Sequence, residues 1–333
     1  MCIRDRYGFI GYTLGIFSII EFFNFLPRIW GQAAENLVLV AVPTFVFMGV
    51  MMERSGVAND MLYVCQVLLK KVPGGLAIAV AVMGTILAAM TGIIGASVTM
   101  MTALALPTML KQGYKHTLAT GVICASGTLG ILIPPSTGMI IYAILTEQSI
   151  GKLFIAGVIP GLLLTGLFLV AIYIVTTLKP ELGPAGEKTA FLEKIASLKN
   201  AGTIIFVVAI TIGGIYFGWF TPVEAAGVGA FLTMIIALIR KELSWKSTKF
   251  VVLQTLRTTA TVFMILIGAH VFIPFMALTE IPSDLVSFLT SIEVGDLGVL
   301  IIILVTYVVL GTFLEGLAML VLTLPIVYPL ILE

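Results

Sequence analysis

Apolar stretches separated by short polar segments follow one another along this chain. They cover residues 7–26, 38–52, 76–91, 96–110, 117–146, 152–178, 202–219, 223–239, 251–278, 297–313 and 316–332. A helix needs about 20 consecutive, mostly apolar residues to cross a bilayer. The pattern predicts an all-α membrane protein with several crossings, although some stretches are too short to cross alone.

Two pairs of short stretches have a glycine-containing polar break between them. The pairs are 76–91 with 96–110, broken by Gly-Ile-Ile-Gly-Ala-Ser, and 297–313 with 316–332, broken by Gly-Thr-Phe-Leu-Glu-Gly. We expect each pair to form a re-entrant helical hairpin, which enters and leaves the membrane on one side; a single kinked span is the alternative. A Leu-Pro pair follows each break, at 106–107 and 324–325, which suggests a duplicated unit.

A third break lies inside the stretch 117–146, where residues 127–136 read Gly-Thr-Leu-Gly-Ile-Leu-Ile-Pro-Pro-Ser. Pro134 and Pro135 remove two backbone donors and prevent a continuous helix. Non-helical backbone at membrane depth is tolerated only where it is buried in protein or lines a polar cavity. The sequence therefore predicts a broken helix at a transport site.

Basic residues predict which side of the membrane each connection faces. Twelve basic residues fall on one side, which is therefore cytoplasmic, if 117–146 and 202–219 cross outward and 152–178 and 223–239 cross inward; they are Lys70, Lys71, Lys111, Lys115, Lys179, Lys188, Lys194, Lys199, Arg240, Lys241, Lys246 and Lys249. Arg28 is the exception. The second pair is flanked by Glu280, Asp284, Glu293 and Asp296, so we expect it to enter from outside. Two similar hairpins inserted from opposite faces form an inverted repeat, which is typical of secondary transporters.

Composition excludes several classes of protein. The 333 residues are 59% hydrophobic and only 11% charged, with mean hydropathy +1.15 and net charge +1. Soluble domains carry about 25% charged residues, and nucleic-acid binders are usually strongly basic. Cys2, Cys65 and Cys124 are odd in number and have no partner histidine, so we expect no disulfide and no zinc site. His116 and His270 are isolated and no phosphate-binding loop is present, so we predict a non-enzyme that takes its energy from an ion gradient or from a partner.

The breaks supply the oxygens that a sodium site needs. Carbonyls freed where helices break, together with Ser and Thr hydroxyls, are suitable ligands. The candidate ion and substrate residues are Thr91, Gly92, Gly95, Ser97, Thr128, Gly130, Pro134, Pro135 and Ser136 around the first hairpin, and Gly311, Thr312 and Glu315 at the second. Of these, the predicted sodium ligands are Gly92, Ser97, Thr128 and Gly130, and separately Gly311 and Thr312. A hydroxyl bonded to its own helix is the alternative for any single Ser or Thr.

Helix amino termini at these breaks carry partial positive charge, which suits an anionic substrate. Glu315 is a better candidate for a functional residue than Glu224, because acidic residues at membrane depth usually have a function. Glu224 follows Thr221-Pro222 and is expected in the first turn of a helix. For His270 we favour helix packing over proton relay.

The chain is expected to divide at its polar segments. We predict scaffold helices and a surface amphipathic helix over 1–72, a first core over 73–178 that contains hairpin 76–110 and broken helix 117–146, a cytoplasmic loop over 179–200, scaffold helices over 201–292, and a second hairpin over 293–333.

Several motifs together resemble those of one transporter family. They are 43–56 (Pro-Thr-Phe-Val-Phe-Met-Gly-Val-Met-Met-Glu-Arg-Ser-Gly), Pro73-Gly74-Gly75, Gly113-Tyr114, the 127–136 break, Ser149–Phe154, Ile159-Pro160-Gly161 and Phe220–Ala226. The chain resembles, over nearly its whole length, the large membrane subunit of tripartite ATP-independent periplasmic (TRAP) transporters.

The resemblance implies sodium-coupled uptake of organic acid anions, such as C4-dicarboxylates or sialic acid, across a bacterial or archaeal inner membrane. It implies a periplasmic substrate-binding protein and a small four-helix membrane subunit as partners, besides the lipid bilayer, and no nucleic acid. It also implies an elevator-type fold similar to that of ion transporters, in which a core with both hairpins slides against a scaffold. Sodium is the coupling ion and no other cofactor is expected.

Two departures from the family pattern matter. The first tip has Ile93 and Ile94 where the family is often richer in small hydroxyl residues, and the second broken helix expected after the second hairpin is absent before Glu333. We therefore expect a chain truncated at both ends. A one-component sodium/organic-anion symporter is the alternative within transport, and an integral-membrane enzyme or channel is the alternative outside it.

Overall fold

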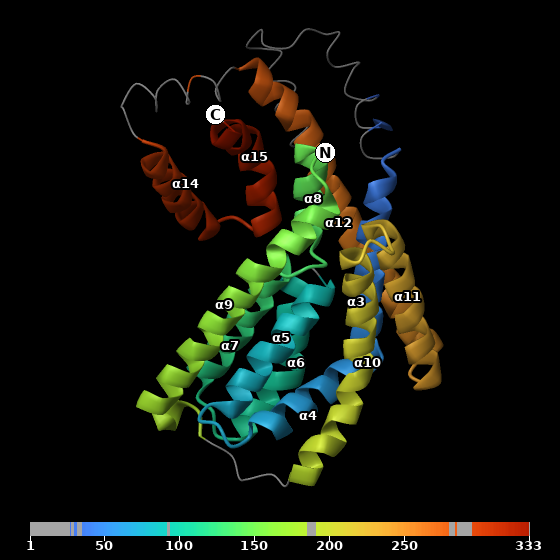
Figure 1. Cartoon of the computed structure of the whole chain (residues 1–333), viewed down its shortest axis with the longest axis vertical. Coiled ribbons are helices and arrows are strands. Elements are labelled where there is room, and N and C mark those ends of the chain that lie inside the picture. The colour runs from blue at the N-terminus through green and yellow to red at the C-terminus, as the bar shows by residue number, and fades with distance from the viewer. Residues whose placement is uncertain are drawn as a thin grey trace. The chain divides into compact units, whose positions relative to one another are not determined.

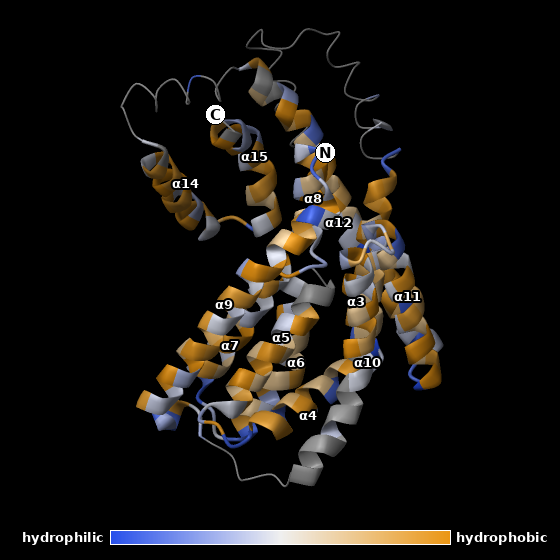
Figure 2. Cartoon of the chain, in the orientation of Figure 1, coloured by the Kyte–Doolittle hydropathy of each residue, from blue (hydrophilic) through white to orange (hydrophobic). Residues whose placement is uncertain are grey.

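A computed structural model describes residues 27, 30–31, 35–91, 94–184, 191–279, 284 and 295–332. Every regular element in these ranges is a helix (Figure 1), which confirms the predicted all-α class. Four of the described helices are long and apolar enough to cross a membrane: Leu37–Arg54, Ile150–Leu178, Pro222–Ile239 and Trp245–Pro274. Hydrophobic residues predominate along most of the described helices, as the orange colouring of Figure 2 shows. The stretch 7–26 lies outside the described residues, as do Arg28, Glu280 and Glu293.

The described helices, in chain order, are η2 (Leu37–Val40), α3 (Ala41–Arg54), α4 (Val57–Leu69), α5 (Gly75–Thr91), α6 (Ile94–Lys111), α7 (His116–Thr128), η3 (Leu129–Ile131), α8 (Thr137–Thr146), α9 (Ile150–Leu178), η4 (Pro180–Leu182), α10 (Phe191–Tyr216), α11 (Pro222–Ile239), α12 (Trp245–Leu278), α14 (Asp296–Gly311) and α15 (Gly316–Leu332). They form two compact units. The larger unit contains residues 40–143 and 148–258; the smaller contains the described residues before 40, 144–147 and those from 259 on.

The two units are compact by contacts alone, and the division into scaffold and core expected from the sequence stays a prediction. α12 begins in the larger unit and ends in the smaller one. α10 begins at Phe191, in the later part of the segment 179–200. Helix continuity explains this start, because a polar segment adjoining an apolar span can extend the same helix into the aqueous phase.

The structure contains the capping hydrogen bonds that the sequence predicts at the start of α11. The Thr221 hydroxyl accepts a hydrogen bond from the Glu224 amide at 3.3 Å, and the Glu224 carboxylate accepts one from the Thr221 amide at 2.8 Å. This reciprocal pair starts α11, with Pro222 in its first turn. Glu224 therefore lies in the first turn of a helix, as expected. Ser149 caps α9 in one direction only, because its hydroxyl accepts a hydrogen bond from the Lys152 amide at 3.5 Å.

Close helix contacts in the larger unit depend on glycine. α11 packs against α3 so tightly that a Cβ at Gly229 would lie 2.3 Å from Met48 Sδ. A Cβ at Gly84 of α5 would lie 2.5 Å from Met101 Cε of α6. Met48 and Met101 are fully buried, so the missing side chains are what let these helices approach.

The predicted amphipathic helix is α4, and its apolar face is covered by protein. Val57, Met61, Leu62 and Cys65 are buried, and α4 packs against α10 and α5. Apolar residues at helical spacing thus find protein partners along this face.

Segments with predicted cytoplasmic lysines and arginines are joined by polar contacts. Arg240 at the end of α11 pairs with Asp60 of α4, and the Arg54 guanidinium lies 3.8 Å above the Phe250 ring. These contacts agree with one shared side for the segments. Which side is cytoplasmic stays a prediction.

The loop after α9 is tied to the starts of α5 and α7. The amides of Lys115 and Gly74 donate to the carbonyls of Leu182 and Gly183, at 3.0 and 3.3 Å. The Tyr114 hydroxyl accepts from the Leu76 amide at 3.1 Å, and burial raises the pKa of this hydroxyl. The ends of α5, α7 and α9 are therefore held together.

In the smaller unit, α14 and α15 are joined by the four residues Thr312–Glu315. The Tyr307 and Thr323 hydroxyls lie 2.7 Å apart and link the two helices. The pair is thus two short helices with a tight connection, as expected. Entry into the membrane from one side only stays a prediction for this pair and for α5 with α6.

Candidate functional site

The helix that begins at His116 breaks where the sequence predicts. α7 ends at Thr128, the short η3 follows, and α8 begins only at Thr137. The Leu129 carbonyl accepts hydrogen bonds from the amides of Leu132 and Ile133, both at 3.0 Å. The chain therefore tightens and turns before the cis peptide bond between Pro134 and Pro135.

The prolines leave two carbonyls without their helical donors. In a helix the amide of residue i bonds the carbonyl of residue i−4, so Pro134 and Pro135 cannot serve Gly130 and Ile131. The Ser136 hydroxyl replaces one donor: it donates to the Ile131 carbonyl at 2.6 Å and accepts from the Met139 amide at 3.4 Å. The Gly130 carbonyl loses its i+4 donor at Pro134 in the same way, which makes it the candidate oxygen for a ligand at the break.

The break is enclosed by protein. Gly130, Pro134, Pro135 and Ser136 are all buried. Because a buried polar atom without a partner is costly, a released carbonyl here favours a polar ligand. This is the environment that irregular backbone at membrane depth requires.

Two glycines of α9 leave room for residues of the break to pack against this helix. A Cβ at Gly157 would lie 2.2 Å from Met139 Cε and 3.0 Å from the Leu132 carbonyl oxygen. A Cβ at Gly161, one turn along α9, would lie 2.6 Å from Ile133 Cγ1. Sequence reasoning missed these residues as parts of the site, although small residues four apart on an apolar helix are a recognisable packing signal.

The first hairpin contacts the break from another direction. A Cβ at Gly127 would lie 2.3 Å from Val98 Cγ2 of α6, so the start of α6 lies directly against the end of α7. Ser97, next to Val98, is fully buried, whereas Gly95 is exposed. The structure thus brings together the predicted segments 94–97 and 127–131. Gly92 lies outside the described residues; Thr91 ends α5.

Thr128 faces outward from the break. Its side chain is exposed and its hydroxyl donates to the Ala125 carbonyl at 2.7 Å. This is the helix bonding that was the alternative to ion binding. A hydroxyl that donates its proton keeps its lone pairs, so the oxygen can still face a cation.

The second predicted tip is exposed. Gly311, Thr312 and Glu315 are all exposed, and the Thr312 hydroxyl donates to the Val309 carbonyl at 2.7 Å. The Glu315 carboxylate accepts hydrogen bonds from the amides of Leu317 and Ala318, at 3.1 and 3.2 Å. It therefore caps α15. This tip belongs to the smaller unit, and each unit is described by itself.

The oxygens at the break suit a monovalent cation better than a transition metal. They are carbonyls and hydroxyls, which are hard and neutral ligands. Within the described ranges, no group of three or more His, Cys, Asp or Glu side chains is placed to hold a metal ion. Cys65 is buried and Cys124 is exposed. His270, which was expected to pack, is buried.

A bundle of apolar helices with a broken helix buried inside it defines a membrane transporter by class. The family model "Tripartite ATP-independent periplasmic transporter, DctM component" matches residues 13–333. The chain belongs to this family of transporter components. It is therefore an integral membrane protein and not an enzyme, as the sequence predicted.

Individual relatives agree with the family assignment. The chain is 34% identical to the C4-dicarboxylate TRAP transporter large permease protein of Pseudomonas aeruginosa, over 91% of this chain and 70% of that protein. It is 31% identical to the isethionate TRAP transporter permease protein of Oleidesulfovibrio alaskensis, over 93% of this chain and 49% of that protein. It is 30% identical to the ectoine/5-hydroxyectoine TRAP transporter large permease protein of Ruegeria pomeroyi, over 88% and 68%. The chain thus spans between about half and about two thirds of the length of these relatives.

Proposed function

We propose that this chain is the large membrane subunit of a sodium-coupled importer of organic acid anions in a bacterial or archaeal inner membrane. The observation that carries the proposal is the break at 128–136. Gly130 and residues 134–136 are buried in it, Pro134 cannot donate to the Gly130 carbonyl, and Gly127 beside it packs against Val98 at the start of α6.

Sodium fits the chemistry of this break. A coupling ion must bind to the core and leave it again, so its ligands should be neutral oxygens rather than a closed cage of carboxylates. The Gly130 carbonyl and the Thr128 hydroxyl supply two such oxygens, and the predicted ligands Gly92 and Ser97 belong to the adjoining hairpin. A second ion at Gly311 and Thr312 is part of the same proposal.

The substrate is proposed to be an organic acid. C4-dicarboxylate, isethionate and ectoine, which the relatives' names mention, share an acidic oxygen group. Helix amino termini can bind such a group without a buried arginine. The start of α8 beside Ser136, and the start of α15 beside Glu315, are the helix termini that the breaks create.

The family description, a tripartite periplasmic transporter, supports partners rather than a one-component symporter. We propose a periplasmic binding protein that delivers substrate and a small membrane subunit that braces this chain. Transport would proceed by an elevator movement of the core that contains the breaks. The Oleidesulfovibrio alaskensis relative is about twice as long as the part of it that this chain matches. Its extra length is compatible with a fused small subunit in that protein.

The sodium assignment is tested by Thr128→Val in the complete transporter, reconstituted in vesicles with its binding protein. Valine keeps the shape and removes the hydroxyl oxygen. We expect the half-maximal sodium concentration for uptake to rise about tenfold, the effect of losing roughly 1.4 kcal/mol.

Thr120→Val is the matched control. Thr120 is also exposed on α7, and its hydroxyl donates to the His116 carbonyl at 2.8 Å in the same way, but it lies two turns before the break. It should leave sodium dependence unchanged. Equal sodium dependence in the Thr128 variant and the wild type would remove Thr128 from the site.

A further inference from the structure

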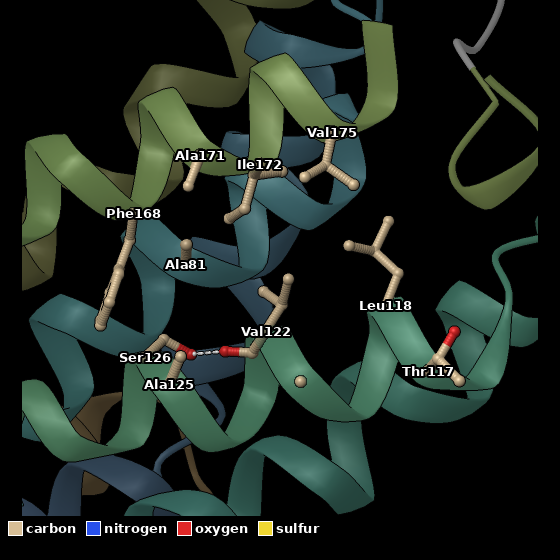
Figure 3. A pocket seen from close by; sticks show the side chains of 11 residues that line it. Ala81, Thr117, Leu118, Val122, Ala125, Ser126, Phe168, Ala171, Ile172 and Val175 are labelled. Atoms are coloured by element: carbon tan, nitrogen blue, oxygen red, sulfur yellow. Dashed lines mark hydrogen bonds between the residues drawn. The ribbon is translucent and has the colours of Figure 1, made fainter. Parts of the chain in front are cut away.

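An apolar groove lies between α7 and α9, with Ala81 of α5 as part of its floor. Its volume is about 230 Å³. Figure 3 shows Phe168 and Ser126 toward one end, and Val175, Leu118 and Thr117 toward the other. The lining residues of α7 recur at one face over more than two turns, so the groove runs along the helices.

The centre of the groove is open because α7 carries glycine there. Gly121 lines the groove, is exposed, and has nothing within 4 Å of the position of a Cβ. In the lipid phase such a groove is filled by whatever apolar molecule fits, since an apolar void forfeits dispersion contacts.

The end of the groove near Thr117 and Val175 is basic. Lys115 immediately precedes α7, and Lys179 follows α9, where its amide bonds the Val175 carbonyl at 2.9 Å. Among the residues that the structure describes, Glu181 is the acid paired with this end: its carboxylate lies 3.9 Å from Lys115 Nζ, and the side chains of Lys115 and Glu181 are 54% and 70% exposed. Such an exposed pair is weak, so two lysines face one loosely held carboxylate.

The amino terminus of α7 adds to this charge. Lys115 is its N-cap residue and makes no side-chain cap, so first-turn amides and the helix dipole both favour an anion beside Thr117. An apolar groove that ends in basic groups matches a molecule with a long apolar part and an anionic head.

Charge distinguishes an anionic lipid from a neutral apolar occupant, because the groove is apolar along its length and has Lys115 and Lys179 near one end.

We propose that this groove binds an anionic phospholipid of the surrounding bilayer. One acyl chain lies between α7 and α9 across Gly121, and the phosphate of the headgroup meets Lys115, Lys179 and the start of α7. All these residues belong to the larger unit, and the proposal does not depend on sodium coupling or on the transported substrate.

The test is lipid binding by the purified full chain in detergent, measured by native mass spectrometry. Phosphatidylglycerol and phosphatidylcholine with identical acyl chains are titrated separately. We expect phosphatidylglycerol to bind at least tenfold more tightly. Lys115→Gln and Lys179→Gln should each weaken phosphatidylglycerol about fivefold and leave phosphatidylcholine unchanged, because each lysine acts on the charge alone. Lys246→Gln, an exposed lysine at the start of α12, is the control.

The apolar part is tested by Gly121→Phe, which should fill the groove and weaken both lipids at least tenfold. Gly166→Phe on α9 is the control, because Gly166 also has nothing near a Cβ and does not line the groove. Thermal melting verifies that both variants fold; if Gly121→Phe does not, the lysine variants decide the question. Equal binding of the two lipids, or lysine variants that bind like the wild type, would overturn the proposal.

Discussion

The break at 128–136 and the turn at 312–315 have similar sequences and opposite environments. Each follows a glycine and contains a threonine whose hydroxyl bonds its own helix, Thr128 to Ala125 and Thr312 to Val309. At the first, a Cβ on Gly127 would lie 2.3 Å from Val98, whereas at the second the nearest atom to a Cβ on Gly311 is Met319 Sδ at 4.0 Å. Most of the first is buried or half-buried, with Thr128 exposed, whereas Gly311, Thr312 and Glu315 of the second are all exposed.

The difference shows how environment selects the group that completes a break. Inside the larger unit, the neutral Ser136 hydroxyl bonds the carbonyl left by Pro135. At the exposed turn, the charged Glu315 carboxylate caps the next helix. A buried carboxylate without a paired cation would be costly, so the hydroxyl suits the interior and the carboxylate suits the exposed turn.

The largest expected contrast comes from filling the two glycines. Gly127→Leu should lower the free energy of unfolding by about 3 kcal/mol, because Val98 is β-branched and has little freedom to move aside. Gly311→Leu should change it by less than about 0.5 kcal/mol. Thermal melting in detergent, followed by tryptophan fluorescence, measures both. Similar melting temperatures for the two variants would show that the first hairpin does not pack against α7 as described.

A smaller contrast is expected from removing the hydroxyls. Ser136→Ala leaves the half-buried Ile131 carbonyl without its donor, at a cost of about 1 kcal/mol. Thr312→Val removes an exposed hydroxyl and should cost less than about 0.5 kcal/mol. Chemical denaturation of both variants gives the comparison. A Ser136 variant as stable as the wild type would mean that the bond at 2.6 Å does not support the break.

The last prediction concerns function at Glu315 more than stability. Glu315→Gln weakens the cap of α15 and should cost about 0.5–1 kcal/mol. Glu224→Gln, which weakens the cap of α11, is the control. If Glu315 also belongs to the transport site, sodium-dependent uptake by the complete transporter falls only in the Glu315 variant. Unchanged uptake in both variants would mean that Glu315 only caps α15 and does not belong to the transport site.

Prediction from sequence succeeded where the cause is local. The break follows from two adjacent residues without amide donors, and the α11 start follows from Thr221 and Glu224 three residues apart. The site was predicted less completely. That Ser136 turns inward to Ile131 while Thr128 is exposed depends on how helices surround the break, which no local pattern contains.

By itself the sequence determined that this protein is a helical membrane protein, where its helices break, and to which family it belongs, because those properties rest on hydropathy, proline and short motifs. Only the tertiary structure decided which breaks are buried. Val98 meets Gly127, and Leu132 meets Gly157, across intervals of more than 20 residues. Packing at such separations depends on the whole arrangement of helices, and it alone turned one break into an enclosed site and left the other exposed.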